Sequence, residues 1–164
     1  MKHVNHASPS PRVQATDLRD PAVLSLIQRN VARNSHMIKT DIKIAALDFE
    51  DDLSEIADLE TVDYILAADV IYDNAITDSF LNFLMRLRVR VAPSVRVMVA
   101  MEKRFVFTVA ELETRAPAYE YLVERLEEVR DRLTVTSVPV RWPQYFCYER
   151  SEEMVMLELG LVAD

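Results

Sequence analysis

The sequence predicts an α/β fold built around an open, largely parallel sheet. Four apolar stretches of strand length each run directly into an acidic residue, and helical signals separate most of them. The stretches, each with its acid, are Arg12–Thr16 with Asp17, Ile42–Leu47 with Asp48, Val62–Ala68 with Asp69, and Val95–Met101 with Glu102. Open parallel sheets bind ligands at the carboxyl ends of their strands. Four acids there predict an acidic crevice, suited to a ligand with ribose hydroxyls, an amino-purine and a cationic centre.

The first half of the chain alternates strands with one clear helix. A strand at Arg12–Thr16 is followed by Asp20 and Pro21, an N-cap and a first-turn proline. Apolar residues at helical spacing then predict a helix over Pro21–Asn34. After the strand at Ile42–Leu47, residues 48–60 are acidic and predict a loop with a helical turn.

The middle of the chain repeats this pattern. Val62–Ala68 is an almost continuous apolar run, which is typical of a strand covered on both faces. Thr77 is expected to cap the next helix, and Pro93 to terminate it. The apolar face of this helix is formed by Phe80, Leu81, Leu84, Leu87 and Val91.

After the strand at Val95–Met101, Thr108 and Glu111 have the spacing of a capping box. This spacing predicts a helix that extends to about Arg130 and is broken or kinked at Pro117.

The tail contains strands without an intervening helix. Leu133–Val140 and Val155–Leu159 read as strands with a turn near Trp142, as in a doubly wound sheet that closes with an antiparallel hairpin. Residues 144–149 could be a short strand or a covering loop. The aromatic residues of this region are expected to pack and not to form a ligand cage; they are Trp142, Tyr145, Phe146 and Tyr148.

Composition limits the class of protein and its partners. The chain has 164 residues, enough for one domain, and a net charge of −8, which gives no electrostatic footprint for nucleic acid or an anionic membrane. A lysine-bearing protein is an easier partner. Cys147 is the single cysteine, so we expect a reducing, intracellular location, nucleus or cytoplasm. No apolar run reaches the ~20 residues of a membrane span, and the scattered histidines predict no metal site.

Glycine usage is unusual. The only glycine is Gly160, whereas an average usage of about 7% would give roughly eleven. Nucleotide-binding α/β folds normally place a glycine-rich turn after the first strand, so that the backbone can approach the ligand. Either this chain binds no nucleotide, or the part that carries the turn is missing.

The segment from Ala67 to Asp73 (AADVIYD) resembles the D-x-x-Y motif of the seven-stranded protein-lysine methyltransferases, methyltransferase family 16. Three further segments also resemble that family, and they follow one another along the chain in the same order as in the family. They are Ala15–Asp17, Glu102–Thr108 and Pro143–Arg150. The resemblance covers about residues 12–160. It implies a Rossmann-like methyltransferase sheet with an antiparallel C-terminal hairpin, an ending that dinucleotide-binding dehydrogenase domains lack.

The chain departs from the family at its start. The family's first strand, glycine-rich loop and following helix are expected before Arg12, where they are absent. We therefore expect residues 1–11 to be a disordered leader and residues 12–164 a partial S-adenosylmethionine-dependent methyltransferase domain. Val62–Ala68 could pair directly with Arg12–Thr16, or the sheet could stay split.

The resemblance assigns the cofactor, S-adenosylmethionine, to Asp17, Asp48, Phe49 and Ala68. Asp17 would accept hydrogen bonds from both ribose hydroxyls, Asp48 would accept from the adenine amino group, and Phe49 would lie against the ring. Each acid also has a simpler interpretation. Asp17 could be a loop residue before the helix cap, and Asp48 a solvated acid in an acidic run.

The resemblance assigns catalysis to Asp69 and Tyr72. Asp69 would orient the substrate lysine amine and balance its charge, and Tyr72 would close the channel. The alternative is that Asp69 only forms a turn that ends the strand. Glu102 could face the same channel, or form a surface ion pair with Lys103 or Arg104.

Three functions follow from this sequence. The first is a protein-lysine N-methyltransferase that uses S-adenosylmethionine, and the second is a non-catalytic truncated form or pseudoenzyme that binds proteins. The third, another nucleotide-binding α/β protein such as a reductase, is disfavoured by the D-x-x-Y segment and the strand-only tail.

Because the glycine turn is missing, we expect weak or absent cofactor binding in this chain. The sequence leaves the substrate protein, the methylation degree and the oligomeric state open.

Overall fold

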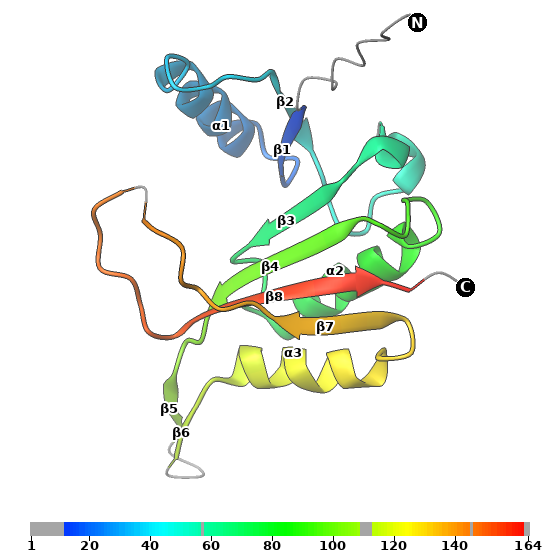
Figure 1. Cartoon of the computed structure of the whole chain (residues 1–164), viewed down its shortest axis with the longest axis vertical. Coiled ribbons are helices and arrows are strands. Elements are labelled where there is room, and N and C mark those ends of the chain that lie inside the picture. Colours follow the sequence, from blue (N-terminus) through cyan, green and yellow to red (C-terminus); the bar gives the residue numbers. More distant parts are fainter. Residues whose placement is uncertain (1–11, 57, 109–112, 145, 163–164) are drawn as a thin grey trace, which may run out of the picture. The chain divides into compact units, whose positions relative to one another are not determined.

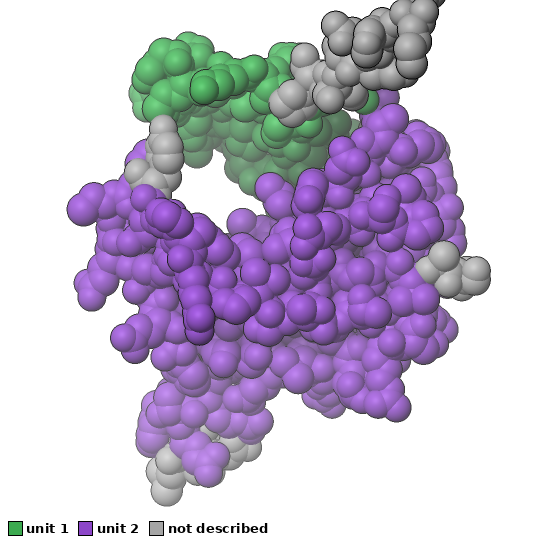
Figure 2. Space-filling model, in the orientation of Figure 1, with its two compact units in different colours: residues 1–51 green, residues 52–164 purple. Residues whose placement is uncertain are grey.

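The computed structural model describes residues 12–56, 58–108, 113–144 and 146–162 (Figure 1). The chain forms two compact units, residues 1–51 and residues 52–164 (Figure 2). Within the described part, no helix is both long enough and apolar enough to cross a membrane.

The first unit is a β-α-β element. Strands β1 (Val13–Asp17) and β2 (Ile42–Ala46) pair in parallel, and helix α1 (Pro21–Arg33) connects them. The predicted helix start is confirmed, because the Asp20 carboxylate accepts a hydrogen bond from the Ala22 amide at 2.7 Å and Pro21 occupies the first turn. A parallel pair with a helical crossover is the unit from which doubly wound sheets are built.

The second unit contains a four-stranded sheet in the order β3-β4-β8-β7. Strands β3 (Tyr64–Ala68) and β4 (Arg96–Glu102) are parallel, and β8 (Met154–Leu161) lies antiparallel between β4 and β7 (Leu133–Ser137). The predicted antiparallel ending is therefore confirmed. In the loop before β3, residues 53–55 and 59–61 form short 3-10 turns, as the acidic stretch predicted.

One face of this sheet forms the core with helices α2 (Asn74–Leu87) and α3 (Pro117–Glu128), which also contact each other. Alternate residues of the strands are buried on that face, together with one apolar stripe of each helix. These residues include Val97, Val99, Met101, Leu157, Leu159, Leu161, Phe80, Leu84, Leu87, Leu122 and Leu126. The predicted apolar face of the helix after β3 is thus buried throughout.

The other face of β3 is exposed, which corrects the prediction that this strand is covered on both faces. Tyr64 is 54% exposed and Leu66 is 77% exposed. In the described part of the chain, β3 pairs only with β4 and is an edge strand. Apolar composition alone does not reveal how many neighbours a strand has, and this explains the error.

An ion pair crosses the exposed face. The Arg96 guanidinium binds the Glu158 carboxylate through two nitrogens and lies over the Tyr64 ring, 5.6 Å from its centroid. Arg96 lowers the pKa of Glu158, and the hydrogen bonds with Glu158 raise the pKa of Arg96. The three side chains come from the adjacent strands β3, β4 and β8, and Tyr64 and Arg96 are the first residues of their strands.

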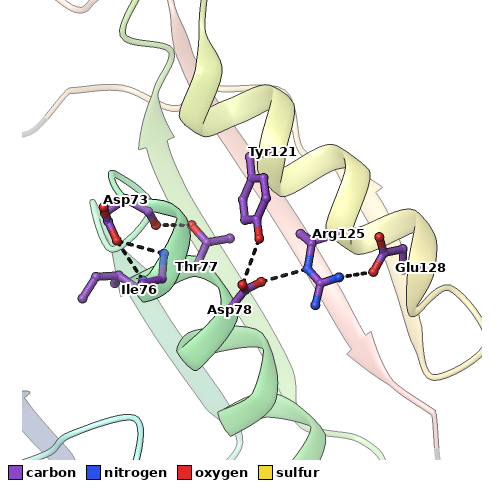
Figure 3. Close-up of polar contacts among 8 residues, drawn as sticks. Asp73, Ile76, Thr77, Asp78, Tyr121, Arg125 and Glu128 are labelled. Carbon is purple, nitrogen blue, oxygen red and sulfur yellow. Dashed lines mark hydrogen bonds and ion pairs between the residues drawn. The ribbon is translucent and has the colours of Figure 1, made fainter.

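Helix α2 begins at a different residue than predicted. Its N-cap is Asp73, whose Oδ1 accepts from the amides of Ala75 (2.9 Å) and Ile76 (3.2 Å) (Figure 3). Thr77, the predicted cap, is fully buried, and its hydroxyl donates to the Asp73 carbonyl at 2.8 Å. Both residue types cap helices. The backbone of Asp73 is extended, as an N-cap requires, so the helix begins at Asn74 and Thr77 lies inside it.

The predicted helix from Thr108 is also wrong. Strands β5 (Val106–Thr108) and β6 (Glu113–Arg115) pair antiparallel, and α3 begins at Pro117 instead of breaking there. Proline suits the first turn of a helix, where its missing N–H has no intrahelical partner. Glu111, the other half of the expected capping box, lies outside the described residues.

The connection from β7 to β8 exposes the aromatic residues that were expected to pack. Trp142, Phe146 and Tyr148 are 44%, 65% and 58% exposed, and Tyr145 lies outside the described residues. Arg150 holds the base of this connection through hydrogen bonds of 3.1 Å to two backbone carbonyls, and its guanidinium lies 5.8 Å from the Trp142 ring centroid.

Asp78 joins the two core helices (Figure 3). Its carboxylate on α2 accepts hydrogen bonds from the Tyr121 hydroxyl and the Arg125 Nε on α3, each at 2.8 Å, and Arg125 also pairs with Glu128. The bond to Asp78 raises the pKa of Tyr121 and that of Arg125.

We expect Asp78→Ala to lower the free energy of unfolding by about 1 kcal/mol, because two donors lose their acceptor while all three side chains stay partly solvated. Urea denaturation measures this. Because the bond to Asp78 raises the folded-state pKa of Tyr121, the part of this contribution that comes from the Tyr121 hydroxyl should be complete below pH ~10 and be lost as the pH rises through the raised pKa, whereas the part from Arg125 remains. Glu127→Ala on the same helix, in a pair that is 67% and 75% exposed, should change stability by less than ~0.5 kcal/mol. Equal losses in both variants would contradict the assignment.

Candidate functional site

Two of the predicted cofactor acids lie at the same end of the first unit's sheet. Asp17 is the last residue of β1 and is opposite Ala46, the last residue of β2. The Leu47 amide donates to the Asp17 carbonyl at 2.8 Å, which carries the pairing one residue further. Asp48 follows directly. Because the strands are parallel, the sheet brings the two carboxylates to one edge, as the sequence predicted.

These carboxylates already make local backbone contacts. Asp17 Oδ1 accepts from the Leu18 amide at 2.8 Å, and Asp48 Oδ1 accepts from the Glu50 amide at 3.0 Å. Both side chains are exposed, whereas Phe49 is half-buried. Each carboxylate can accept several further hydrogen bonds. Asp48 therefore forms a turn, as its simpler interpretation predicted, and still presents acceptor oxygens to solvent.

Asp69 has an unusual backbone conformation in the second unit. Its φ of 57° lies in the left-handed region, which non-glycine residues seldom adopt but aspartate tolerates better than most. Its amide donates to the Ala100 carbonyl at 2.8 Å, so the β3–β4 pairing continues one residue beyond Ala68. The chain then turns away from the sheet at Asp69, and the side chain is left exposed.

Arg104 binds the Asp69 carboxylate. Its Nη2 lies 2.7 Å from Asp69 Oδ2, and the two side chains are 56% and 57% exposed. The sequence had suggested Arg104 only as a possible partner of Glu102, so this contact was missed. The available signal was that β3 and β4 are consecutive parallel strands, since the residues that follow such strands emerge at the same edge.

The residues after Asp69 anchor the segment to the core. Ile71 is buried with 3% exposure, and Asp73 caps α2, while Tyr72 between them is 54% exposed. The motif therefore alternates anchoring residues with residues that face solvent. Asp69 and Tyr72, the predicted catalytic pair, are the solvent-facing members.

The six predicted site residues belong to both units. Asp17, Asp48 and Phe49 are in the first unit, and Ala68, Asp69 and Tyr72 are in the second. Within the described residues, no three histidine, cysteine or acidic side chains cluster in a way that could hold a metal ion.

A family model described as lysine methyltransferase, methyltransferase family 16, matches residues 3–136. This chain belongs to that family. The mouse methyltransferase-like protein 22 is 32% identical over 162 aligned residues, which cover 84% of this chain and 41% of the mouse protein. The human methyltransferase-like protein 22 is 30% identical over 84% of this chain and 40% of its own length. The chain thus spans about two fifths of the curated relatives that it matches, and the resemblance seen in the motifs is confirmed.

Solved structures of methyltransferases share the fold. The mitomycin 7-O-methyltransferase MmcR matches with a TM-score of 0.57 and 14% identity, over 94% of this chain and 43% of that chain. The glycopeptide N-methyltransferase MtfA, solved with S-adenosylmethionine, matches with a TM-score of 0.54 and 14% identity, over 92% and 77%. At this identity the match concerns the fold, and it confirms the Rossmann-like methyltransferase sheet.

The two aspartates that flank Tyr72 should differ in their effect on stability. Asp73→Ala removes the N-cap of α2 and should lower the free energy of unfolding by about 1 kcal/mol. Asp69→Asn keeps a side chain that tolerates the left-handed backbone and should change it by less than ~0.5 kcal/mol. Denaturant titration of both variants tests this. If Asp69→Asn were the more damaging change, Asp69 would be a structural residue.

Proposed function

We propose that this chain belongs to a protein-lysine N-methyltransferase that uses S-adenosylmethionine, with Asp69 and Tyr72 at the lysine and Asp17 and Asp48 at the nucleoside. The observation that carries the proposal is the Asp69 carboxylate, held in solvent at the end of β3 by a left-handed backbone. Membership of a family described as lysine methyltransferase supports the choice of substrate.

The first unit fits the nucleoside part of the cofactor. Ribose hydroxyls and the adenine amino group are donors, and Asp17 and Asp48 present exposed acceptor oxygens at one edge of the sheet. Phe49, half-buried beside Asp48, offers a ring for the base. When bound, S-adenosylmethionine supplies a methyl group attached to a positively charged sulfur.

The second unit fits the amine. The lysine nitrogen must donate its lone pair to the methyl carbon while the carbon–sulfur bond breaks and its electron pair returns to sulfur, after which the nitrogen releases a proton. Such a transfer depends mainly on positioning. Asp69 would accept a hydrogen bond from the amine and so orient the nitrogen lone pair toward the methyl carbon. Tyr72, which is also exposed, would close the channel that the lysine enters.

One observation favours the alternative, a protein-binding module without catalysis. The only glycine of the chain, Gly160, lies in β8, so the chain has no glycine-rich turn for the methionine part of the cofactor. The acidic composition and the exposed aromatic residues between β7 and β8 would suit binding of a lysine-bearing protein in either case.

In the natural protein that carries this chain, Asp69→Ala should abolish lysine methylation and leave cofactor affinity nearly unchanged. Asp17→Ala should instead weaken cofactor binding by about 1.5–3 kcal/mol, the usual loss for hydrogen bonds to a charged group. Mass spectrometry of the substrate and calorimetric titration give the two readouts, and each variant is the control for the other. Wild-type turnover in Asp69→Ala would refute the proposed role of Asp69.

The 164-residue chain by itself should bind S-adenosylmethionine very weakly or not at all, because no glycine turn lets the backbone approach the charged methionine end. Isothermal titration calorimetry tests this expectation. A micromolar dissociation constant would contradict it and would favour the enzyme over the protein-binding module.

A further inference from the structure

The two oxygens of the Asp69 carboxylate have different environments. Oδ2 binds Arg104 at 2.7 Å, whereas Oδ1 has no hydrogen-bond partner among the residues that the structure describes. We infer that Arg104 is a positioning residue that offsets the charge of Asp69, so that the free oxygen receives the substrate lysine as a neutral amine. The inference rests on the proposed lysine methyltransferase function.

The chemical need for such a residue follows from the charge of lysine. An ordinary lysine has a pKa near 10.4, so nearly all of it is protonated at neutral pH and has no lone pair to donate. A carboxylate close to the amine favours the protonated form still further. An acid that binds lysine well therefore binds it in the unreactive state. A cation on the same carboxylate opposes this effect while leaving one oxygen to accept a hydrogen bond from the neutral amine.

Arginine is suited to this task. Its guanidinium remains charged at every pH at which lysine titrates, so the compensation does not vanish as the amine loses its proton. A lysine at the same position would titrate together with the substrate.

The geometry directs Arg104, and not its neighbour, to Asp69. The amino group of Lys103 lies 4.4 Å from the centroid of the Tyr119 ring on α3, and the Lys103 amide donates to the Glu153 carbonyl at 3.0 Å. Lys103 is therefore engaged elsewhere. The hydrogen bond from the Asp69 amide to Ala100 fixes the end of β3 against β4, the strand that leads to Arg104.

Other charged groups near this end of the sheet do not replace Arg104. Asp73, at the start of α2, directs its Oδ1 to two helix amides. Glu102, opposite Met154 at the end of the β4–β8 pairing, and Glu153 before β8 are acidic and exposed. Both would favour a protonated amine, so they increase the need for a compensating cation.

The first test is the pH dependence of kcat for lysine methylation by the natural protein at saturating substrate, because kcat reports the pKa of the lysine bound to the enzyme. For Arg104→Gln we expect the rise of kcat with pH to shift by about 0.5 unit to higher pH, with kcat about threefold lower at pH 7.5, because uncompensated Asp69 stabilises the ammonium. Arg104→Lys should restore the wild-type rate only well below the pKa of lysine, because at higher pH its own charge is lost together with that of the substrate. Arg130→Gln removes the same charge from an exposed position after α3 and should leave the profile unchanged. An unshifted profile in Arg104→Gln would overturn the inference.

The second test needs neither cofactor nor turnover. At pH 7 n-pentylamine is almost entirely protonated, and its binding can be followed by the backbone amide signal of Asp69 in ¹⁵N-labelled protein. Arg104→Gln should bind this cation at least threefold more tightly than wild type, and Arg130→Gln should match wild type. Equal affinities would overturn the inference. If wild type methylates no lysine at any pH, the proposed function fails, and the amine titration still decides the role of Arg104.

Discussion

Burial of one sheet face beneath α2 and α3 is the interaction on which the candidate site depends. Side chains such as Val97, Val99 and Leu159 are almost completely buried there, and each contributes roughly 1.5–3 kcal/mol by leaving water. An exposed ion pair contributes at most about 1 kcal/mol. The position of Asp69 is therefore set by the packing of β3 against β4 and by Ile71 in the core. The contact with Arg104 adds little to stability, which is consistent with the positioning role proposed for Arg104.

Much of the fold could be predicted because the strands carry the apolar pattern of the core. The parallel direction of the first four strands, the start of α1 at Asp20 and the antiparallel ending were readable from the sequence, but not which strands pair. The errors arose where a local signal had two solutions. Asp73 and Thr77 can each cap a helix, and the structure uses Asp73 as the cap and buries Thr77 in the core. Pro117 can break a helix or begin one, and the β5–β6 hairpin before it selects the second.

The site could be predicted in part. Strand ends placed Asp17 and Asp48 at one edge of the first unit's sheet, since parallel strands share a direction. Two features could not be read. The left-handed backbone of Asp69 depends on how β3 leaves the sheet, and the ion pair joins residues that are 35 positions apart. Local sequence carries no information on which of several exposed arginines will reach a given acid.

The partners of the acids distinguish their roles more clearly than their positions do. Asp20 and Asp73 bind the amides of helix starts and are structural. Asp17 and Asp48, although proposed to bind the nucleoside, also accept hydrogen bonds from backbone amides that follow them. The Asp69 carboxylate differs from all four, because its described partner is a cation from another segment of the chain. The Asp69 carboxylate supports no local backbone turn, and an exposed ion pair such as its contact with Arg104 contributes at most about 1 kcal/mol to stability. Among these five acids, Asp69 is therefore the one whose described contacts contribute least to folding, which is the pattern expected of the catalytic role proposed for it.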